Sequence, residues 1–305
     1  MNLDDFQAFC LSDSNESACI QMLLEARWPN GFQCPNCGNS RAYRTSTRRL
    51  PLFQCTACGS QTSLISGTIL EGSRTPIRLW LLAIFLHSSP DGINAMQLQS
   101  LIGTTYKTAW LICHKIRHAM SHADRQRLLG NIVRINFAQY GRPYNPTVFR
   151  HPQEQPLLIG GSLNEEGHFS YIKIKQAVEE CFYPQYTCPL NKHPFIRKHV
   201  SPDAEEIVAV TVKFSRTRNL RLIDLSRRAS LWIHFQFRGI GPKHLQAYLD
   251  QYCFGYNITV QKVSAFHTLL SMSASAPTIT YPQLIKKPNI QPRLRSQYVD
   301  LLRSA

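Results

Sequence analysis

The sequence has no long apolar run and few acidic side chains, and both absences narrow the kinds of protein it can encode. None of its 305 residues belongs to a stretch near the ~20 apolar positions of a membrane helix. The longest apolar stretch, residues 79–86, is typical of one buried face of a helix. Acids at Asp4 and Asp5 stand where a secretory signal needs a positive region. We therefore expect a cytoplasmic protein with no membrane partner.

Acidic residues number 19 against 34 lysines and arginines, which gives a formal net charge of +15. The first 60 residues are balanced, so the basic excess begins after them. A hydrophobic content of 43% is enough for a folded core, which excludes disorder of the whole chain. A strongly basic protein favours polyanions, and nucleic acid is the first of these. We expect DNA as the partner, a location at the nucleoid and no small-molecule substrate. The sequence leaves a homo-oligomer open.

Two cysteine pairs carry the most specific signal. They are Cys34-Pro-Asn-Cys37-Gly and Cys55-Thr-Ala-Cys58-Gly. Two residues between cysteines let both thiolates face one ion, and the following glycine permits a tight turn. Four thiolates form a closed tetrahedral site, which suits structural Zn²⁺ and not hydrolysis. A redox dithiol is the alternative, but it usually stands in a βαβ unit, which is absent here.

The remaining cysteines lack the spacing of metal ligands. In a cytoplasmic chain they are expected to be buried or inert thiols and not disulfides. They are Cys10, Cys19, Cys113, Cys181, Cys188 and Cys253.

Two helical segments follow the cysteine pairs, at 93–103 and 104–118, with a glycine between them. Apolar residues at helical spacing would face a common core: Ile93, Met96, Leu101, Ala109, Ile112 and Ile116. This pattern predicts a helix-turn-helix, in which the start of the second helix contacts DNA. The predicted contacts are Thr104, Thr105, Tyr106 and Lys107, with Lys115 further along. An ordinary helical hairpin is the alternative.

Two basic clusters are candidates for phosphate contact. The first is Arg44, Arg48 and Arg49, in the loop between the cysteine pairs. The second is Arg216, Arg218, Arg221, Arg227 and Arg228, followed by Trp232, Phe235 and Phe237. Basic residues with interleaved aromatics are typical of a surface that tracks a phosphate backbone. A solvated hairpin tip and an aromatic core strand beside exposed arginines are the respective alternatives.

The order of these features resembles bacterial insertion-sequence transposases of the ISXO type, which have a zinc ribbon and a DDE catalytic domain. The segments that carry the resemblance are 28–38, 54–58, 61–70, 80–84, 92–98, 106–110, 158–164, 171–175 and 241–252. The resemblance extends from about residue 28 to residue 286, and its specific parts are the zinc-ribbon half and the Lys243-His244-Leu245 block.

The resemblance implies a multidomain α+β protein. Its parts would be a helical lead-in (1–27), a zinc ribbon (28–70), a helix-turn-helix region (71–128), an RNase H-like α/β domain (129–260), and a C-terminal extension with a flexible basic tail (261–305). In the family, the first two modules bind the terminal repeats of the element. An acidic triad in the RNase H-like domain holds two divalent metals, which support DNA cleavage and strand transfer.

The chain departs from the family at the expected catalytic positions. The first family aspartate falls on Asn136, and no aspartate occurs at all between residues 125 and 202. The second falls near Ala209 or Val210. A hard divalent ion needs anionic oxygens, and an asparagine offers only a neutral carbonyl. The resemblance therefore predicts a site without its metal ligands.

Two aspartates remain as weak catalytic candidates. Asp203 lies at the turn before the strand that should carry the second acid, and Asp224 is the only acid near the third position. The leading interpretation is a transposase-family protein that binds terminal-repeat-like DNA without cutting it. An active transposase that uses Mg²⁺ or Mn²⁺ at an intact site is one alternative. A non-DNA interaction protein that reuses the scaffold is the other.

Overall fold

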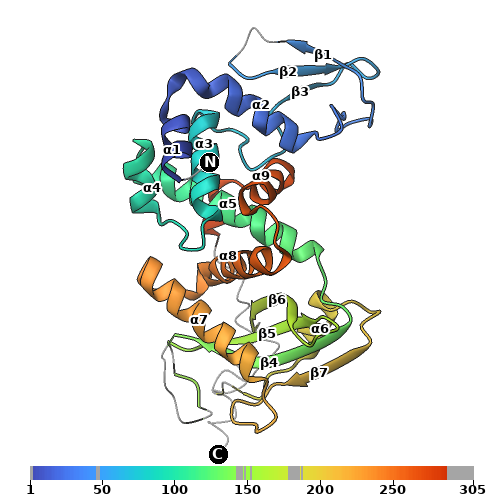
Figure 1. The fold of residues 1–305 in the computed structure, drawn as a ribbon, viewed down its shortest axis with the longest axis vertical. Helices are drawn as coiled ribbons and strands as arrows, with labels where there is room; N and C mark the ends of the chain where they lie inside the picture. Colours follow the sequence, from blue (N-terminus) through green and yellow to red (C-terminus); the bar gives the residue numbers. More distant parts are fainter. Residues whose placement is uncertain are drawn as a thin grey trace, which may run out of the picture.

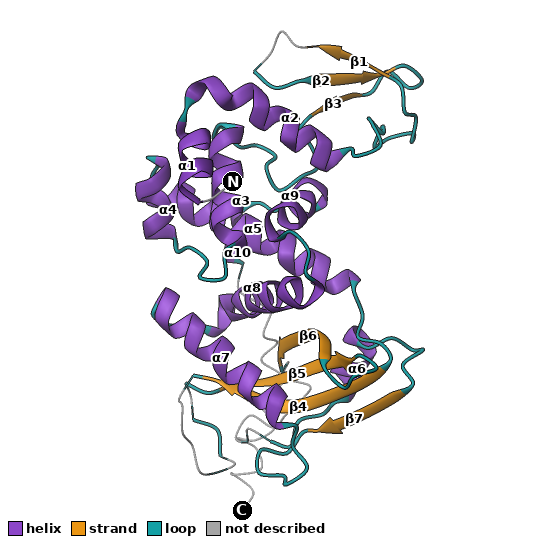
Figure 2. Ribbon diagram, in the orientation of Figure 1, coloured by secondary structure: helices purple, strands orange, loops and turns teal. Residues whose placement is uncertain are grey.

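The structure, a computed structural model, describes residues 3–45, 49–141, 147, 149–151, 153–177, 186 and 188–286. A three-stranded sheet lies at one end, a four-stranded sheet at the other, and helices lie between them (Figure 1). Figure 2 shows the same division by secondary structure, with the two orange sheets separated by purple helices. In the described part of the chain, no helix has the length and apolar character needed to cross a membrane.

Residues 3–27 form two helices joined by a short turn, and they support the small sheet. Helix α1 (Leu3–Leu11), the turn η1 (Asp13–Asn15) and helix α2 (Glu16–Arg27) precede the strands β1 (Ala42–Thr45), β2 (Leu52–Cys55) and β3 (Gln61–Ser63), which pair antiparallel in that order. The Arg27 guanidinium donates hydrogen bonds to the carbonyls of Ser63, Leu64 and Ser66. The end of α2 is thereby tied to the last strand of the sheet.

The central helices bury one continuous apolar core. Helices α3 (Ile77–Ser88), α4 (Ala95–Ile102), α5 (Tyr106–Gln126) and α9 (Ala265–Ser275) pack with α1 and α2. The Glu16 carboxylate accepts hydrogen bonds from the backbone N–H groups of Ile77 (2.8 Å) and Arg78 (3.1 Å). A carboxylate at this position satisfies free N–H groups and complements the helix dipole. The start of α3 is therefore capped by a side chain from α2.

Helix α9 belongs to this core although it lies in the predicted C-terminal extension. Its Phe266, Leu269 and Leu270 are buried against α2, α3 and α5. A short helix α10 (Tyr281–Ile285) follows. The predicted flexible tail falls mainly on residues 287–305, outside the described residues.

The larger sheet has the order β6-β5-β4-β7. Strands β4 (Ile132–Tyr140), β5 (Gln155–Leu163) and β6 (Phe169–Gln176) are antiparallel neighbours, and β7 (Glu206–Val210) runs parallel to β4. Helices α7 (Leu220–Phe237) and α8 (Pro242–Gln261) cover one face, and α6 (His193–His199) packs on the other. Side chains that alternate along β4 and β5 contribute to the two cores in turn.

A buried ion network joins α5 to the sheet half. Asp124 Oδ2 lies 3.1 Å from Lys173 Nζ and 2.5 Å from Lys175 Nζ, and Lys175 Nζ lies 2.6 Å from Asp250 Oδ1. Burial opposes the charge of Lys175, but the carboxylates of Asp250 and Asp124 outweigh it and raise the pKa of Lys175. Ser121 Oγ also donates to Asp250 at 2.7 Å. The long helix α5 is therefore fixed to β6 and α8 by paired charges.

Of the cysteines outside the two pairs, Cys10, Cys19, Cys113, Cys188 and Cys253 are free and buried, as predicted. Cys181 lies outside the described residues.

Candidate metal centre and nucleic-acid surfaces

The two cysteine pairs lie in matching turns of the small sheet. The Gly38 N–H donates to the Cys34 carbonyl at 2.9 Å, and the Gly59 N–H donates to the Cys55 carbonyl at 3.0 Å. Both glycines have positive φ angles, +73° and +70°. A residue with a side chain rarely adopts this conformation, so the glycines after the pairs permit these tight turns.

The four cysteine sulfurs converge on one point. The Sγ atoms of Cys34 and Cys58 are 3.7 Å apart, those of Cys37 and Cys55 are 3.6 Å apart, and all four lie within 4.8 Å of one another. A tetrahedral Zn²⁺ with bonds of about 2.3 Å would separate its sulfurs by about 3.8 Å. The cluster therefore has the donor set and spacing of structural zinc, as the sequence predicts.

Backbone hydrogen bonds favour the thiolate form of two of these ligands. The backbone N–H of Cys58 lowers the pKa of Cys55 to about 6. A backbone hydrogen bond from Ser60 likewise lowers the pKa of Cys58. Thiolate is the form that binds zinc, so these bonds reduce the competition between protons and metal.

The structure describes two of the three arginines predicted to contact phosphate in the ribbon. Arg44 lies on β1 and is exposed beside Tyr43, which is 71% exposed. Arg49 is exposed, and its guanidinium donates to the Arg74 carbonyl at 3.0 Å. Arg48 falls outside the described residues. Arg44 and Arg49 are thus accessible to a phosphate.

The two predicted helices 93–103 and 104–118 are present as α4 and the first part of α5. The Asn94 side chain accepts from the Gln97 N–H at 3.0 Å and begins α4, and Gly103 ends it with a φ of +61°. The Thr105 side chain then accepts from the Thr108 N–H at 3.3 Å and begins α5. A three-residue turn, 103–105, therefore separates two well-capped helices.

The first turn of α5 presents most of the predicted DNA contacts. Thr105, Tyr106 and Lys107 are exposed, and Thr104 is half-buried. Part of this surface contacts α10, because Lys107 Nζ lies 5.2 Å from the centre of the Tyr281 ring.

Two residues of the helix pair do not lie where the sequence placed them. Lys115 is 6% exposed, and its Nζ donates to the Glu71 carbonyl at 3.0 Å. It stabilises the core and does not lie on the surface formed by the start of α5. Met96 is 66% exposed, while Leu98 and Ile102 are buried. Leu98 and Ile102 are four residues apart and share the buried face of α4, whereas Met96, two residues before Leu98, lies on the other side of the helix.

The second basic cluster surrounds the start of α7, which is a helix and not the core strand considered as the alternative. Arg216, Arg221, Arg227 and Arg228 are exposed. Arg228 pairs with Asp224 at 2.8 Å. Arg218 differs, because its guanidinium donates to the carbonyls of Ser215 (2.8 Å) and Lys213 (2.7 Å). Among the aromatics, the Phe235 side chain is 70% exposed.

In the larger sheet, two of the expected acid positions lie side by side. Asn136 on β4 is directly opposite Val210 on the parallel strand β7. Asn136 is 1% exposed, and its Oδ1 accepts from the Asn219 N–H at 3.1 Å, at the start of α7. Its Nδ2 is buried without a hydrogen-bond partner in the described part of the chain. Near the third expected position, Leu222 is fully buried and Asp224 is exposed.

The two candidate aspartates do not complete an acidic site. Asp203 is exposed on the turn before β7, and Asp224 is exposed on α7 and paired with Arg228. Within the described residues, the four cysteines are the only group of three or more His, Cys, Asp or Glu side chains that could hold a metal ion.

Residues 14–61 match the family of transposase zinc-ribbon domains. A stretch of 119 residues, 39% of the chain, is 27% identical to an uncharacterized protein in the transposable element ISH50 of Halobacterium salinarum. The match spans 40% of the length of that protein. No solved structure matches the chain. The N-terminal part is thus a transposase-type zinc ribbon, and the matched region includes α2, which Arg27 ties to the sheet.

Proposed function

We propose that the chain is a transposase-type DNA-binding protein that holds DNA without cutting it. The ribbon supplies one set of contacts with DNA. The start of α5, which belongs to a helix-turn-helix region at 71–128, supplies another. The observation that carries this proposal is the pair Asn136 and Val210, which occupy neighbouring positions on β4 and the parallel edge strand β7 and carry no charge. Two-metal DNA cleavage needs carboxylates there, because Mg²⁺ prefers anionic oxygens.

The strand order supports an RNase H-like assignment for residues 129–260. Three antiparallel strands followed by a fourth that is parallel to the first give the order β6-β5-β4-β7. In the resembling transposases the first acid is on the first strand and the second follows on the parallel strand. The pairing of Asn136 with Val210 agrees with these positions.

Exposed basic groups on distinct elements support DNA binding. Arg44 and Arg49 belong to the ribbon, Lys107 to α5, and Arg221 and Arg227 to α7. A net charge of +15 adds long-range attraction to a polyanion. Zinc is the resident metal in this proposal, held by the four cysteines, and it stabilises the ribbon without taking part in a reaction.

A single gel tests binding and cutting together. The zinc-loaded protein is incubated with supercoiled plasmid, with and without Mg²⁺ or Mn²⁺, over a range of salt concentrations. The expected result is salt-sensitive retardation without nicking. Metal-dependent nicking that disappears in Asp203→Ala or Asp224→Ala would instead identify an active transposase. Absence of both retardation and nicking would favour an interaction protein.

A further inference from the structure

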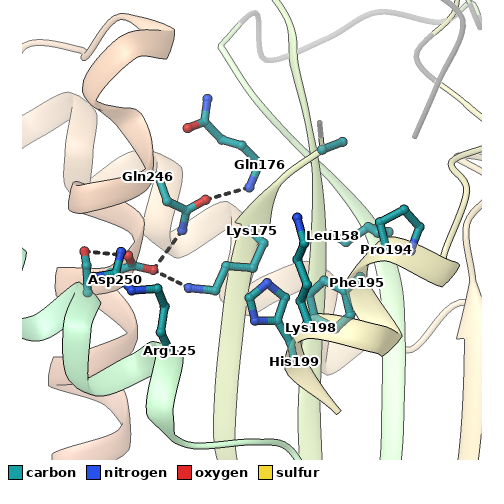
Figure 3. Close-up of a pocket in the computed structure, with 12 residues that line it drawn as sticks. Arg125, Leu158, Lys175, Gln176, Pro194, Phe195, Lys198, His199, Gln246 and Asp250 are labelled. Carbon is teal, nitrogen blue, oxygen red and sulfur yellow. Dashed lines mark hydrogen bonds and ion pairs between the residues drawn. The ribbon is translucent and has the colours of Figure 1, made fainter. Parts of the chain in front are cut away.

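A cavity of about 210 Å³ lies where the helical half meets the larger sheet. Its walls come from the end of α5, the edge strand β6, helix α6 and helix α8. Figure 3 shows Lys175 projecting into this region between Arg125 of α5 and His199 of α6. The cavity lies at the β6 edge of the sheet and is separate from Asn136, which lies on β4 beside the start of α7.

Positive charge dominates the lining. Arg125, Lys175 and Lys198 contribute three cations, and Asp250 contributes one carboxylate. Lys175 is 8% exposed and is already paired with acids. Arg125 and Lys198 are exposed at the rim, and in the described part of the chain neither makes an ion pair or a hydrogen bond. Two cations are thus left for a ligand.

A buried polar atom at the cavity also lacks a partner. The Nδ1 atom of His199 has no hydrogen-bond partner among the described residues. Burial, followed by the charges of Lys175 and Lys173, lowers the pKa of His199 to about 4. The imidazole is therefore neutral at pH 7 and can donate or accept one more bond. The charges of Lys175 and Lys173 contribute to this lowered pKa after burial, and an anion would offset them.

The rest of the lining is apolar. Leu158, Pro194 and Phe195 form a buried wall. Sites for small organic ligands combine such apolar walls with a few polar groups that fix orientation. The lining therefore suits a ligand with an anionic group at one end and an uncharged, ring-like body at the other.

We propose that this cavity binds the phosphate monoester of a nucleotide, with the phosphate among the cations that line it, Arg125, Lys175 and Lys198, and the nucleoside against the apolar wall. A phosphate monoester carries about −1.5 to −2 charges at pH 7, which matches the two unpaired cations. Guanidinium and ammonium groups are the usual partners of phosphate oxygens. A free nucleoside monophosphate and a 5′-phosphorylated DNA end both offer this chemistry. The inference does not depend on whether the protein cuts DNA.

The first test is titration calorimetry of the zinc-loaded full chain with deoxyadenosine monophosphate. Loss of one charge-assisted contact should weaken binding by about tenfold or more, in Lys198→Ala and in Arg125→Ala. Both side chains are exposed, so the variants should fold. Arg197→Ala is the matched control, since Arg197 is an exposed cation on the same helix that does not line the cavity. Its affinity should stay within about twofold of the parent protein.

The second test compares DNA duplexes that carry a 5′-phosphate or a 5′-hydroxyl. Preference for the phosphorylated duplex that is lost in Lys198→Ala, but kept in Arg197→Ala, would support the proposal and identify a DNA end as the source. Binding of the free nucleotide with the same dependence would identify a small molecule. If neither ligand distinguishes Lys198→Ala from Arg197→Ala, the proposal is wrong.

Discussion

The zinc ribbon and the larger sheet differ in how they depend on metal ligands. The ribbon keeps four converging cysteines, and beside them Trp28, Phe32 and Phe53 pack with ring centres 5.0–5.3 Å apart. Other buried apolar side chains of the ribbon belong to the core of the helices, namely Leu64, Ile69 and Leu70. The sheet has neutral residues at the expected acid positions but is packed by an apolar cluster on each face. The ribbon should unfold without its zinc ligands, because a small metal domain depends on the metal for its fold. The fold of the sheet should not depend on metal ligands, because apolar clusters pack both of its faces.

Removal of a ribbon ligand is expected to have the largest effect. Cys55→Ser should abolish zinc binding and unfold the ribbon, because structural zinc contributes about 10–16 kcal/mol of binding free energy in zinc-finger peptides. Zinc content by mass spectrometry and limited proteolysis measure the two consequences. Cys113→Ala, which removes a buried thiol outside the cluster, should keep its zinc. A protease-resistant, zinc-loaded Cys55→Ser protein would contradict the comparison.

In the sheet half, we expect the charges of the buried ion network to be the ones that stabilise the fold. Asp124→Ala leaves Lys173 and Lys175 buried with one carboxylate fewer, which should lower the free energy of unfolding by about 3–5 kcal/mol. Urea denaturation measures the change. Asp203→Ala, at an exposed carboxylate, should stay within about 0.5 kcal/mol. Equal effects of the two variants would show that the network does not stabilise the contact of α5 with β6 and α8.

An acid introduced at one of the expected acid positions should destabilise the protein. Asn136→Asp places a carboxyl in a buried site, which should lower stability by about 1–3 kcal/mol at pH 7. Burial raises the pKa of such a carboxyl, so the deficit should be absent below about pH 4 and grow as the pH rises. Mg²⁺ should not reduce it, since Val210, directly opposite position 136, offers no second carboxylate.

Thermal unfolding over a pH series measures this deficit. Asn131→Asp, at an exposed position, is the control and should show none. Stabilisation of Asn136→Asp by Mg²⁺ would mean that the sheet retains a metal site.

The smallest expected effect concerns DNA affinity. Lys107→Ala should weaken binding several-fold and reduce the slope of log affinity against log salt by about 1, as expected for one phosphate contact. Fluorescence anisotropy at several salt concentrations measures both. Lys192→Ala, an exposed cation of the sheet half, should leave the slope unchanged. Identical slopes for Lys107→Ala and the parent protein would show that the start of α5 is not part of the DNA-binding surface.

Local signals in the sequence predicted the parts that depend on local spacing. The cysteine pairs predicted a converging cluster, because two intervening residues and a glycine define the turn. The segments 93–103 and 104–118 are helical, with Gly103 at the end of the first. The expected acid positions Asn136 and Val210 pair directly across two strands.

Contacts between distant parts of the chain could not be predicted in the same way. Lys115 has the appearance of a surface lysine, and only the fold places the Glu71 carbonyl beside its Nζ. The Asp124 network draws on residues up to Asp250, which no short pattern connects. Helix α9 was part of a segment with many serines, and its buried face is evident only once α2, α3 and α5 surround it.

Helix α5 presents an exposed surface at its first turn, and its length also fixes the distance between its two ends. Its 21 residues run without a break from the exposed turn at Tyr106 to the charge network at Asp124. A rise of about 1.5 Å per residue makes the helix about 30 Å long. Duplex DNA advances about 3.4 Å per base pair, so this length corresponds to roughly nine base pairs. A DNA duplex bound at one end of the helix and a molecule bound at the other end would therefore be held at a fixed distance from each other.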